Sequence, residues 1–251
     1  MDLPEGLTLL TGENGHGKSN LLEALYILAM ARSARASVER DLINHAYAPS
    51  SEQEPTYAKV SATAHNGKLS NRIEIHYKCL YSENKDGFAT QKYIRINGSP
   101  KRPSDLIGTL NAVLFTVDDL DLVFGNPTVR RRYLDILISQ IEKPYLDALK
   151  RYQESNRQRN HLLRSIREGT SSQDELRFWD DQLAENGCEI MKSRIATVNR
   201  LSSLLKPFHI QLGAAEESLQ LLYRPTIPIE NDTPTSDSIL LALEGSRTRD
   251  I

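Results

Sequence analysis

Cysteine is scarce in this sequence: only two of its 251 residues are cysteines, Cys79 and Cys188. The two lie far apart and match no metal-ligand spacing, so we expect no disulfide framework and a reducing, cytoplasmic setting. The sequence also has no apolar run long enough to span a membrane and no visible signal peptide. These absences point away from a membrane protein or a disulfide-rich secreted domain, and we expect no membrane partner.

The sequence also has no large excess of basic or acidic residues. Lys and Arg number 31 and Asp and Glu number 33, which gives a net charge of −2. This balance neither demands nor excludes nucleic acid as a partner, because a local basic patch can bind it. With 39% hydrophobic and 25% charged residues, the composition is that of a globular chain long enough for one large domain or two small ones.

One stretch near the N-terminus carries a specific pattern. The apolar run Leu7 to Leu10 predicts a strand, and apolar residues at helical spacing from Leu21 to Ala29 predict a helix. Eight residues between them fit the P-loop pattern G-x-x-x-x-G-K-[ST], in the strand–loop–helix setting that the pattern requires. These residues are Gly12, Glu13, Asn14, Gly15, His16, Gly17, Lys18 and Ser19.

The chemistry of this loop suits phosphate. Its glycines allow the backbone to turn its N–H groups inward around an anion, and the start of the following helix adds a positive dipole end. Lys18 can reach the β- and γ-phosphates of a nucleotide, and Ser19 can bind Mg²⁺. We therefore predict that the eight residues bind the phosphates of ATP, with Ser19 as the Mg²⁺ ligand. The loop alone does not distinguish ATP from GTP, and an ordinary glycine-rich turn is the alternative.

The segment after this helix predicts strands. Residues 57–65 and 72–80 alternate apolar and polar side chains, and residues 92–99 form a third run that meets an Asn-Gly turn. Turn signals at residues 66–67 and 82–87 separate the three runs. Together they predict an antiparallel meander beside a nucleotide-binding sheet.

Residues 111–119 are open to two interpretations. A buried strand that ends in Asp118 and Asp119 would be a Walker B strand, whose acids hold Mg²⁺ and polarise the attacking water. The chain continues directly into residues 120–123, Leu-Asp-Leu-Val, which have the spacing of an amphipathic turn. We therefore favour a loop at the edge of the sheet, and we assign no catalytic residue.

From about residue 127 the pattern becomes helical. Residues 129–141 and 173–206 carry apolar side chains at helical spacing, and Pro144 suits the first turn of a helix that runs to about Arg167. A short polar turn at residues 169–172 should join the last two helices into an antiparallel hairpin.

The two arms of this hairpin differ in charge. Residues 129–168 hold ten Lys and Arg against five Asp and Glu, whereas residues 173–206 hold five against six. The basic arm could follow a phosphate backbone, or it could pair with the acidic arm across the hairpin. The candidate DNA contacts are Arg130, Arg131, Arg132, Lys150, Arg151, Arg157 and Arg159.

We predict three parts in the chain: residues 1–126 as a partial P-loop ATPase lobe, 127–206 as a lobe of helical arms, and 207–251 as an incomplete return to the first lobe. In the last part we expect strands at residues 208–212 and 219–223 and a short helix at residues 238–246.

Taken together, these segments resemble a known family. They are similar to the RecF DNA-repair ATPases, relatives of the SMC proteins, and the similarity runs along nearly the whole chain. The matching segments are residues 12–24, 32–33, 94–98, 112–120, 129–135 and 157–163.

The resemblance implies an α/β fold: an ABC-type ATPase head with a helical second lobe. Such proteins bind ATP, form a head-to-head homodimer around it, and load onto DNA at single-stranded gaps and junctions. They act in replication, recombinational repair and SOS induction with the RecO and RecR proteins, and their slow ATP hydrolysis is linked to release from DNA. The resemblance also places Thr116, Asp118 and Asp119 in the region of the Q-loop.

The sequence departs from the family pattern at several points. His16 stands where Gln is common and Val117 where Pro is common, but neither position supplies an obligatory ligand. We find no signature motif of the Ser-x-Gly-Gln type and no Walker B strand, and the family's opening strand, which would precede Met1, is absent. We therefore expect a fragment cut at both ends, which can hold phosphates but lacks the residues that activate water.

Two other functions are open. A small-molecule phosphotransferase would use the same P-loop, but it usually needs an Arg-bearing lid, and the long paired helices carry no Gly-rich hinge for one. A structural arm protein with a vestigial nucleotide site would bind no nucleotide. We rank an ATP-gated DNA-binding head first, and a slow DNA-dependent ATPase activity is implied only for the full-length family.

Overall fold

The computed structural model describes residues 1–44, 55–66, 69–82, 87–213, 219–227 and 233–250. Within these ranges the chain forms two compact units, Met1–Leu120 and Asp121–Ile251. The first unit combines helices with an antiparallel sheet, and the second is built from helices. This mixed architecture confirms the predicted α/β fold class.

Four antiparallel strands form the sheet of the first unit, in the order β1-β2-β3-β4. They are β1 (Thr56–Asn66), β2 (Leu69–Ser82), β3 (Gly87–Ile96) and β4 (Ser99–Lys101). Asn97 and Gly98, with φ angles of 51° and 80°, make the tight turn between β3 and β4, as expected for Asn-Gly in a two-residue hairpin. The predicted meander is confirmed, and the tips of the other two hairpins, residues 67–68 and 83–86, lie outside the described residues.

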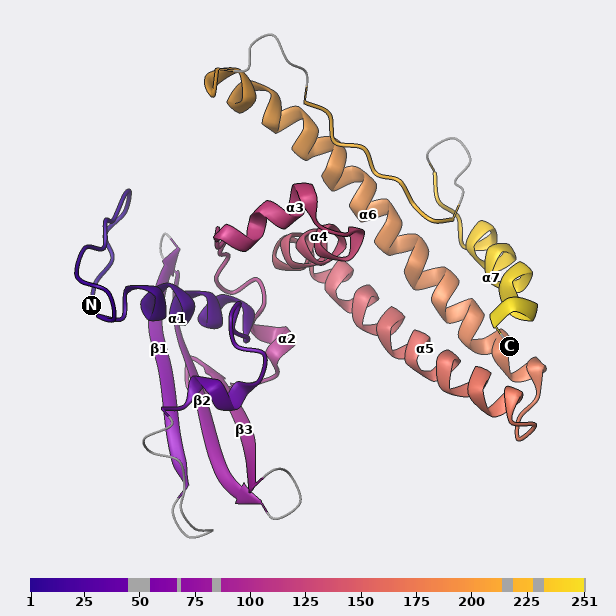
Figure 1. Ribbon diagram of the computed structural model, residues 1–251, viewed down its shortest axis with the longest axis horizontal. Coiled ribbons are helices and arrows are strands. Elements are labelled where there is room, and N and C mark those ends of the chain that lie inside the picture. The colour runs from indigo at the N-terminus through magenta and orange to yellow at the C-terminus, as the bar shows by residue number, and fades with distance from the viewer. Residues whose placement is uncertain (45–54, 67–68, 83–86, 214–218, 228–232, 251) are drawn as a thin grey trace. The chain divides into compact units, whose positions relative to one another are not determined.

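One face of this sheet is buried. Ile73, Ile75 and Tyr77 alternate along β2 and are at most 1% exposed, as the two-residue period of a strand covered on one side requires. Helix α1 (Lys18–Met30) covers this face with Ile27 and Leu28 (Figure 1). Apolar packing on the sheet therefore positions the helix that follows the P-loop. Short helical turns complete the unit: η1 (Glu39–Leu42), α2 (Pro103–Leu106) and η3 (Val117–Leu120).

The predicted strand at residues 7–10 is wrong. The structure has no regular secondary structure there, and the side chains of Leu7 and Leu9 are 96% and 80% exposed. A strand needs a neighbour that shares its backbone hydrogen bonds. No described strand lies beside this segment, since the sheet contains only β1 to β4. The apolar run therefore leads into the P-loop as an unpaired segment.

Three long helices dominate the second unit: α4 (Pro127–Ile141), α5 (Lys143–Arg167) and α6 (Leu176–Gln211). α5 and α6 lie antiparallel, side by side, and the turn between them includes η4 (Gln173–Glu175) (Figure 1). The buried side chains of Ile138, Tyr145 and Ile190 pack together and join the three helices. The predicted hairpin is confirmed.

The chain after Pro207 differs from the prediction. Residues 208–211 are the last turn of α6 and not a strand. A proline removes its own N–H from the helix, but α6 continues through Pro207 to Gln211. Residues 219–223 form no strand in the structure. The predicted helix is confirmed and is longer than expected, since α7 runs over Ser236–Asp250.

The structure divides the chain between Leu120 and Asp121, where the short helix α3 (Asp121–Phe124) begins. α7 packs against α6 within the second unit (Figure 1). The division into two lobes with a return at residue 207 stays a prediction. None of the described helices has the length and apolar character to cross a membrane.

Candidate nucleotide-binding site

The P-loop turns at three glycines and ends where α1 begins. Gly12, Gly15 and Gly17 have φ angles of 151°, 87° and 84°, conformations that residues with a Cβ rarely adopt. A Cβ on Gly15 or Gly17 would meet no atom within 4 Å, so the backbone angle and not a clash accounts for these glycines. Gly17 is the N-cap of α1 and no side chain caps the helix there. The first N–H groups of the helix are therefore available to an anion.

Lys18 is the first residue of α1, and its ammonium group folds back over the loop. Nζ donates hydrogen bonds of 2.7 Å to the carbonyl oxygens of Gly12 and Glu13. Because an ammonium group has three donors, one remains for a phosphate oxygen. The lysine holds the loop together and places a positive charge at its mouth.

The other predicted ligands lie on the surface of the loop. The side chains of Glu13, Asn14 and Ser19 are exposed, and Glu13 lies 3.8 Å from the His16 ring. Within the described ranges, no group of three or more His, Cys, Asp or Glu side chains could hold a metal ion by itself.

Contacts behind α1 were not predicted from the sequence. Lys92 of β3 donates a 2.9 Å hydrogen bond to the carbonyl of Ala31, the C-cap residue of α1, and forms an ion pair with Glu39. The Ser33 hydroxyl donates to the Glu23 carboxylate. Because these contacts join residues far apart in the chain, no local pattern could have revealed them. The Lys92 contacts fix the end of the P-loop helix to the sheet.

The predicted Q-loop region lies where a loop passes into η3. The N–H and hydroxyl of Thr116 donate to Oδ2 of Asp119 at 2.5 Å and 3.2 Å, which closes the turn locally. Phe115 and Val117 are 80% and 81% exposed, so the segment is not a buried Walker B strand. The loop interpretation is confirmed, and the Q-loop role of Thr116, Asp118 and Asp119 stays a prediction.

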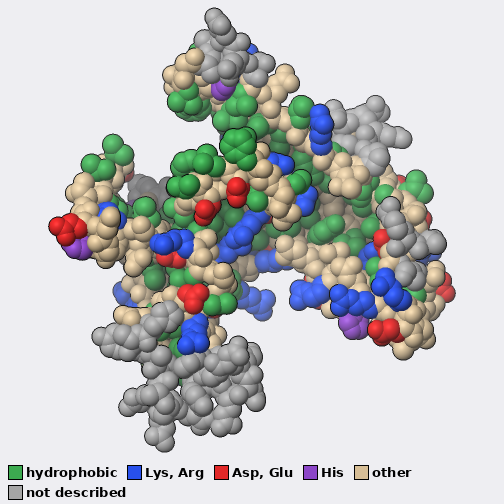
Figure 2. Space-filling model, in the orientation of Figure 1, with side chains coloured by type: hydrophobic (Ala, Val, Ile, Leu, Met, Phe, Trp, Pro, Cys, Tyr) green, Lys and Arg blue, Asp and Glu red, His purple; other side chains and the backbone are tan. Residues whose placement is uncertain are grey.

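Most of the predicted DNA contacts lie on the surface of α4 and α5, and Figure 2 shows Lys and Arg side chains gathered over α5. Several have exposed local partners: Arg130 with the carbonyls of Leu122 and Gly125, Arg131 with Thr128, Lys150 with Asp147, and Arg157 with Glu154. Arg151 instead donates a 2.8 Å hydrogen bond to buried Asn186 of α6. Arg132 is exposed, and no described side chain is bonded to it. Exposed pairs of this kind are weak, so these groups can exchange their partners for phosphate.

Arg159 does not belong to this surface, and its prediction as a DNA contact is corrected. The residue is 5% exposed. Its Nε donates a 2.6 Å hydrogen bond to Asp180, and its Nη1 donates to Asp250 at 3.1 Å. Asp180, fully buried on α6, also accepts two hydrogen bonds from Arg247 of α7. The Arg159 side chain points toward α6 and α7 and cannot reach a phosphate.

A second charged cluster joins α4, α5 and α6. The Tyr145 hydroxyl donates to Asp135 at 2.5 Å, and Arg194 donates to Tyr145 at 3.0 Å and to Asp135 at 2.6 Å. Burial raises the pKa of Tyr145 above its ordinary value, and the hydrogen bond to Asp135 adds to the shift. The tyrosine is therefore a neutral donor that connects a carboxylate with a guanidinium.

The glycine loop, the helix that starts at its lysine and the sheet that this helix covers define the chain's class as a P-loop ATPase domain. A family described as "AAA domain" matches residues 1–205.

Curated relatives are DNA replication and repair proteins named RecF. The chain is 39% identical over 246 residues to the protein of Herpetosiphon aurantiacus, a match that covers 96% of this chain and 63% of the relative. It is 35% identical over 255 residues to the protein of Roseiflexus castenholzii, with 99% and 64% covered. The chain thus spans somewhat less than two thirds of the length of these relatives.

Solved structures agree with these relatives. The recombination mediator protein RecF-ATP of the RecFOR pathway matches with a TM-score of 0.82 at 28% identity, which covers 100% of this chain and 63% of that protein. The corresponding RecF-ATPrS structure gives a TM-score of 0.81 at 29% identity, with 100% and 64% covered. The chain therefore belongs to the AAA domain family, and the relatives and solved structures that it resembles are RecF proteins.

Proposed function

We propose that this chain is the ATP-binding part of a DNA replication and repair protein in which bound nucleotide controls the retention of DNA. The observation that carries the proposal is the position of Lys18. Its ammonium group lies in the mouth of a glycine-rich loop at the N-terminus of α1, with two donors engaged and one available. A similar protein solved as RecF-ATP supports ATP as the nucleotide.

Different groups of the loop bind the phosphates and the Mg²⁺ ion. The N–H groups of residues 12–19 and of the first turn of α1 hold the phosphates, and Lys18 supplies a full positive charge. The Ser19 hydroxyl binds Mg²⁺, which neutralises phosphate charge when it is present. Because the sequence contains no Walker B strand, we expect this chain to bind ATP without hydrolysis above background.

The DNA-directed part of the proposal follows the family. We propose that the whole protein dimerises around ATP and acts with RecO and RecR at single-stranded gaps and junctions, in recombinational repair and SOS induction. The match to proteins of the RecFOR pathway supports this proposal. On this chain, the exposed cations of α4 and α5, such as Arg131, Arg132 and Arg157, would contact the phosphate backbone.

The test is a Lys18→Ala variant assayed by equilibrium dialysis with ATP and Mg²⁺. Loss of the ammonium group should weaken ATP binding by at least about tenfold, or about 1.4 kcal/mol. The control is Lys192→Ala, because Lys192 is exposed on α6 and no described residue is bonded to it. Equal ATP affinity in the Lys18→Ala variant and the unaltered chain would refute the nucleotide site.

DNA retention is measured separately, on duplex DNA with and without ATP. We expect ATP to increase retention by the unaltered chain and to have no effect on the Lys18→Ala variant. Retention that is independent of ATP in both proteins would leave the nucleotide site intact and refute the gating.

A further inference from the structure

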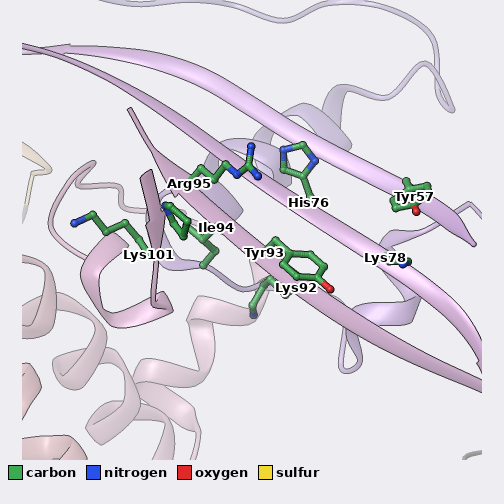
Figure 3. A pocket seen from close by; sticks show the side chains of 9 residues that line it. Tyr57, His76, Lys78, Lys92, Tyr93, Ile94, Arg95 and Lys101 are labelled. Carbon is green, nitrogen blue, oxygen red and sulfur yellow. The ribbon is translucent and has the colours of Figure 1, made fainter. Parts of the chain in front are cut away.

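The face of the sheet that points away from α1 carries basic and aromatic side chains. We call it the outer sheet face. Because strand residues alternate between faces, the residues on β2 that flank buried Ile75 and Tyr77 lie on it. A hollow of about 500 Å³ on this face is lined by Tyr57, His76, Lys78, Tyr93, Arg95 and Pro100, among others (Figure 3). All of them belong to the first unit, so the surface is complete within one part of the chain.

The strand register brings these side chains together. Tyr57 on β1 pairs with Lys78 on β2, and Tyr93 on β3 pairs with His76 on β2. Residues opposite each other on one face are close enough to contact the same ligand. Arg95 follows Tyr93 on the same face of β3, and Figure 3 shows these side chains projecting from neighbouring strands.

The outer sheet face has an excess of positive charge. Among the described residues of β1, β2 and β3, Glu74 is the one carboxylate on this face, and Lys59 and Arg72 bind it at 2.7 Å and 3.3 Å. The hydrogen bond from Lys59 and the charges of both cations lower the pKa of Glu74, so it is ionised at neutral pH. No described carboxylate pairs with Lys78 or Arg95. These cations are available to an anionic ligand.

Two tyrosines on this surface are exposed to solvent and do not belong to the hydrophobic core. Tyr57 and Tyr93 are 60% and 50% exposed. Nζ of Lys78 lies 5.9 Å from the centre of the Tyr57 ring, and the Tyr93 hydroxyl donates a 2.6 Å hydrogen bond to Gln91. Each ring is thus held beside other side chains of the sheet while much of its surface is open to solvent.

We propose that the outer sheet face binds single-stranded nucleic acid with little sequence preference. Cations that follow a backbone and aromatic rings on which bases stack are the two components of such sites. A duplex fits less well, because its bases are stacked on each other and cannot reach a tyrosine ring. The cations would also bind an acidic peptide, but such a peptide has no bases that could stack on the two exposed tyrosine rings. The inference rests on the proposed DNA function and requires no nucleotide in the P-loop.

The experiment measures the fluorescence anisotropy of a labelled oligothymidylate without ATP. Tyr93→Ala and Arg95→Gln should each weaken binding by about tenfold, since stacking on one aromatic residue contributes about 1–3 kcal/mol per base. Tyr93→Phe should retain most of the affinity, because the ring and not the hydroxyl provides the stacking. The matched control is Arg72→Gln, a cation on the same face whose charge is already paired with Glu74.

The outcomes separate this inference from the proposed function. Binding of the oligonucleotide that is unchanged by Tyr93→Ala and Arg95→Gln would overturn the inference, and so would equal competition by duplex DNA or by polyglutamate. The Lys18→Ala variant should bind the oligonucleotide normally, and the two sheet variants should bind ATP normally. Failure of the nucleotide site and failure of the sheet site would therefore appear in different measurements.

Discussion

The two units of this protein differ in whether they also bury charged groups. In the first unit, Lys18 and the cations of the outer sheet face lie at the surface, above a core of aliphatic side chains and Tyr77. In the second unit, Asp180 and Arg159 are almost completely enclosed between helices. A charge at the surface is available to a ligand, whereas a buried charge is committed to its partner. The exposed charges are thus the candidates for function, and the buried ones for the specificity of helix packing.

The largest expected effect comes from breaking the buried network of the second unit. Asp180→Asn keeps the size of the side chain but leaves Arg159 and Arg247 without their shared negative charge. We expect the free energy of unfolding to fall by about 3–5 kcal/mol, as for other buried pairs that lose one partner. Urea unfolding followed by circular dichroism measures the change. A loss below about 1 kcal/mol would show that buried charge does not distinguish this unit from the first.

The difference between the units also explains what the sequence could predict. The P-loop is made by eight consecutive residues, so its glycines, Lys18 and Ser19 were identified from a local pattern. The hairpin of α5 and α6 was predicted from the period of its apolar residues and the short turn between them. Both features are local, and the chain shows them without reference to distant residues.

Non-local pairing accounts for the errors. Arg159 shares a basic arm with Arg157, but only its contact with Asp180 on α6 shows that it is buried. The segment Leu7 to Leu10 has the composition of a strand, but pairing depends on a neighbour elsewhere in the chain. The outer sheet face was missed because its residues come from separate strands, and only the register places Tyr93 beside His76.

Alkaline pH provides a second test, since each unit contains a buried tyrosine with a raised pKa, Tyr77 in the first and Tyr145 in the second. Burial raises the pKa of both Tyr77 and Tyr145 above the ordinary value near 10. Above about pH 10 an unfolded tyrosine loses its proton while the buried one keeps it. The unfolded state then binds fewer protons, so stability falls as pH rises, by up to about 1.4 kcal/mol per pH unit for each tyrosine. Urea unfolding between about pH 9 and pH 11 measures the slope.

The control for this pH dependence is the same series in Tyr145→Phe. The variant should lose stability less steeply above about pH 10, because one of the two linked groups is gone. An unchanged slope would assign the alkaline loss to groups other than Tyr145.

At neutral pH, removing the hydroxyl of Tyr145 or of Tyr77 should have different and smaller effects on the free energy of unfolding. The Tyr145 hydroxyl is bonded to Asp135 and Arg194, whereas the hydroxyl of Tyr77 has no hydrogen-bond partner in the part of the chain that the structure describes. Tyr145→Phe should lower the free energy of unfolding by about 1–3 kcal/mol, because two charged groups lose a shared partner. Tyr77→Phe should change it by less than about 0.5 kcal/mol or stabilise the protein slightly. Thermal unfolding of both variants measures the difference, and equal losses would contradict it.

The smallest expected effect is that of Glu244→Gln, since Glu244 pairs with Arg247, which also binds Asp180. Arg247 contacts buried Asp180 at 2.7 Å and also Glu244, one helical turn away on α7, at 3.7 Å. The Glu244 side chain is 46% exposed, so water screens this pair and replaces it easily. Glu244→Gln should therefore lower the free energy of unfolding by no more than about 0.5 kcal/mol, in the same urea experiment that measures Asp180→Asn. Both carboxylates face one guanidinium, but Asp180 is buried and also binds Arg159, so the two losses compare an enclosed network with an exposed pair. Comparable losses would mean that the position of Arg247, and not the enclosure of Asp180, determines the energy of the network.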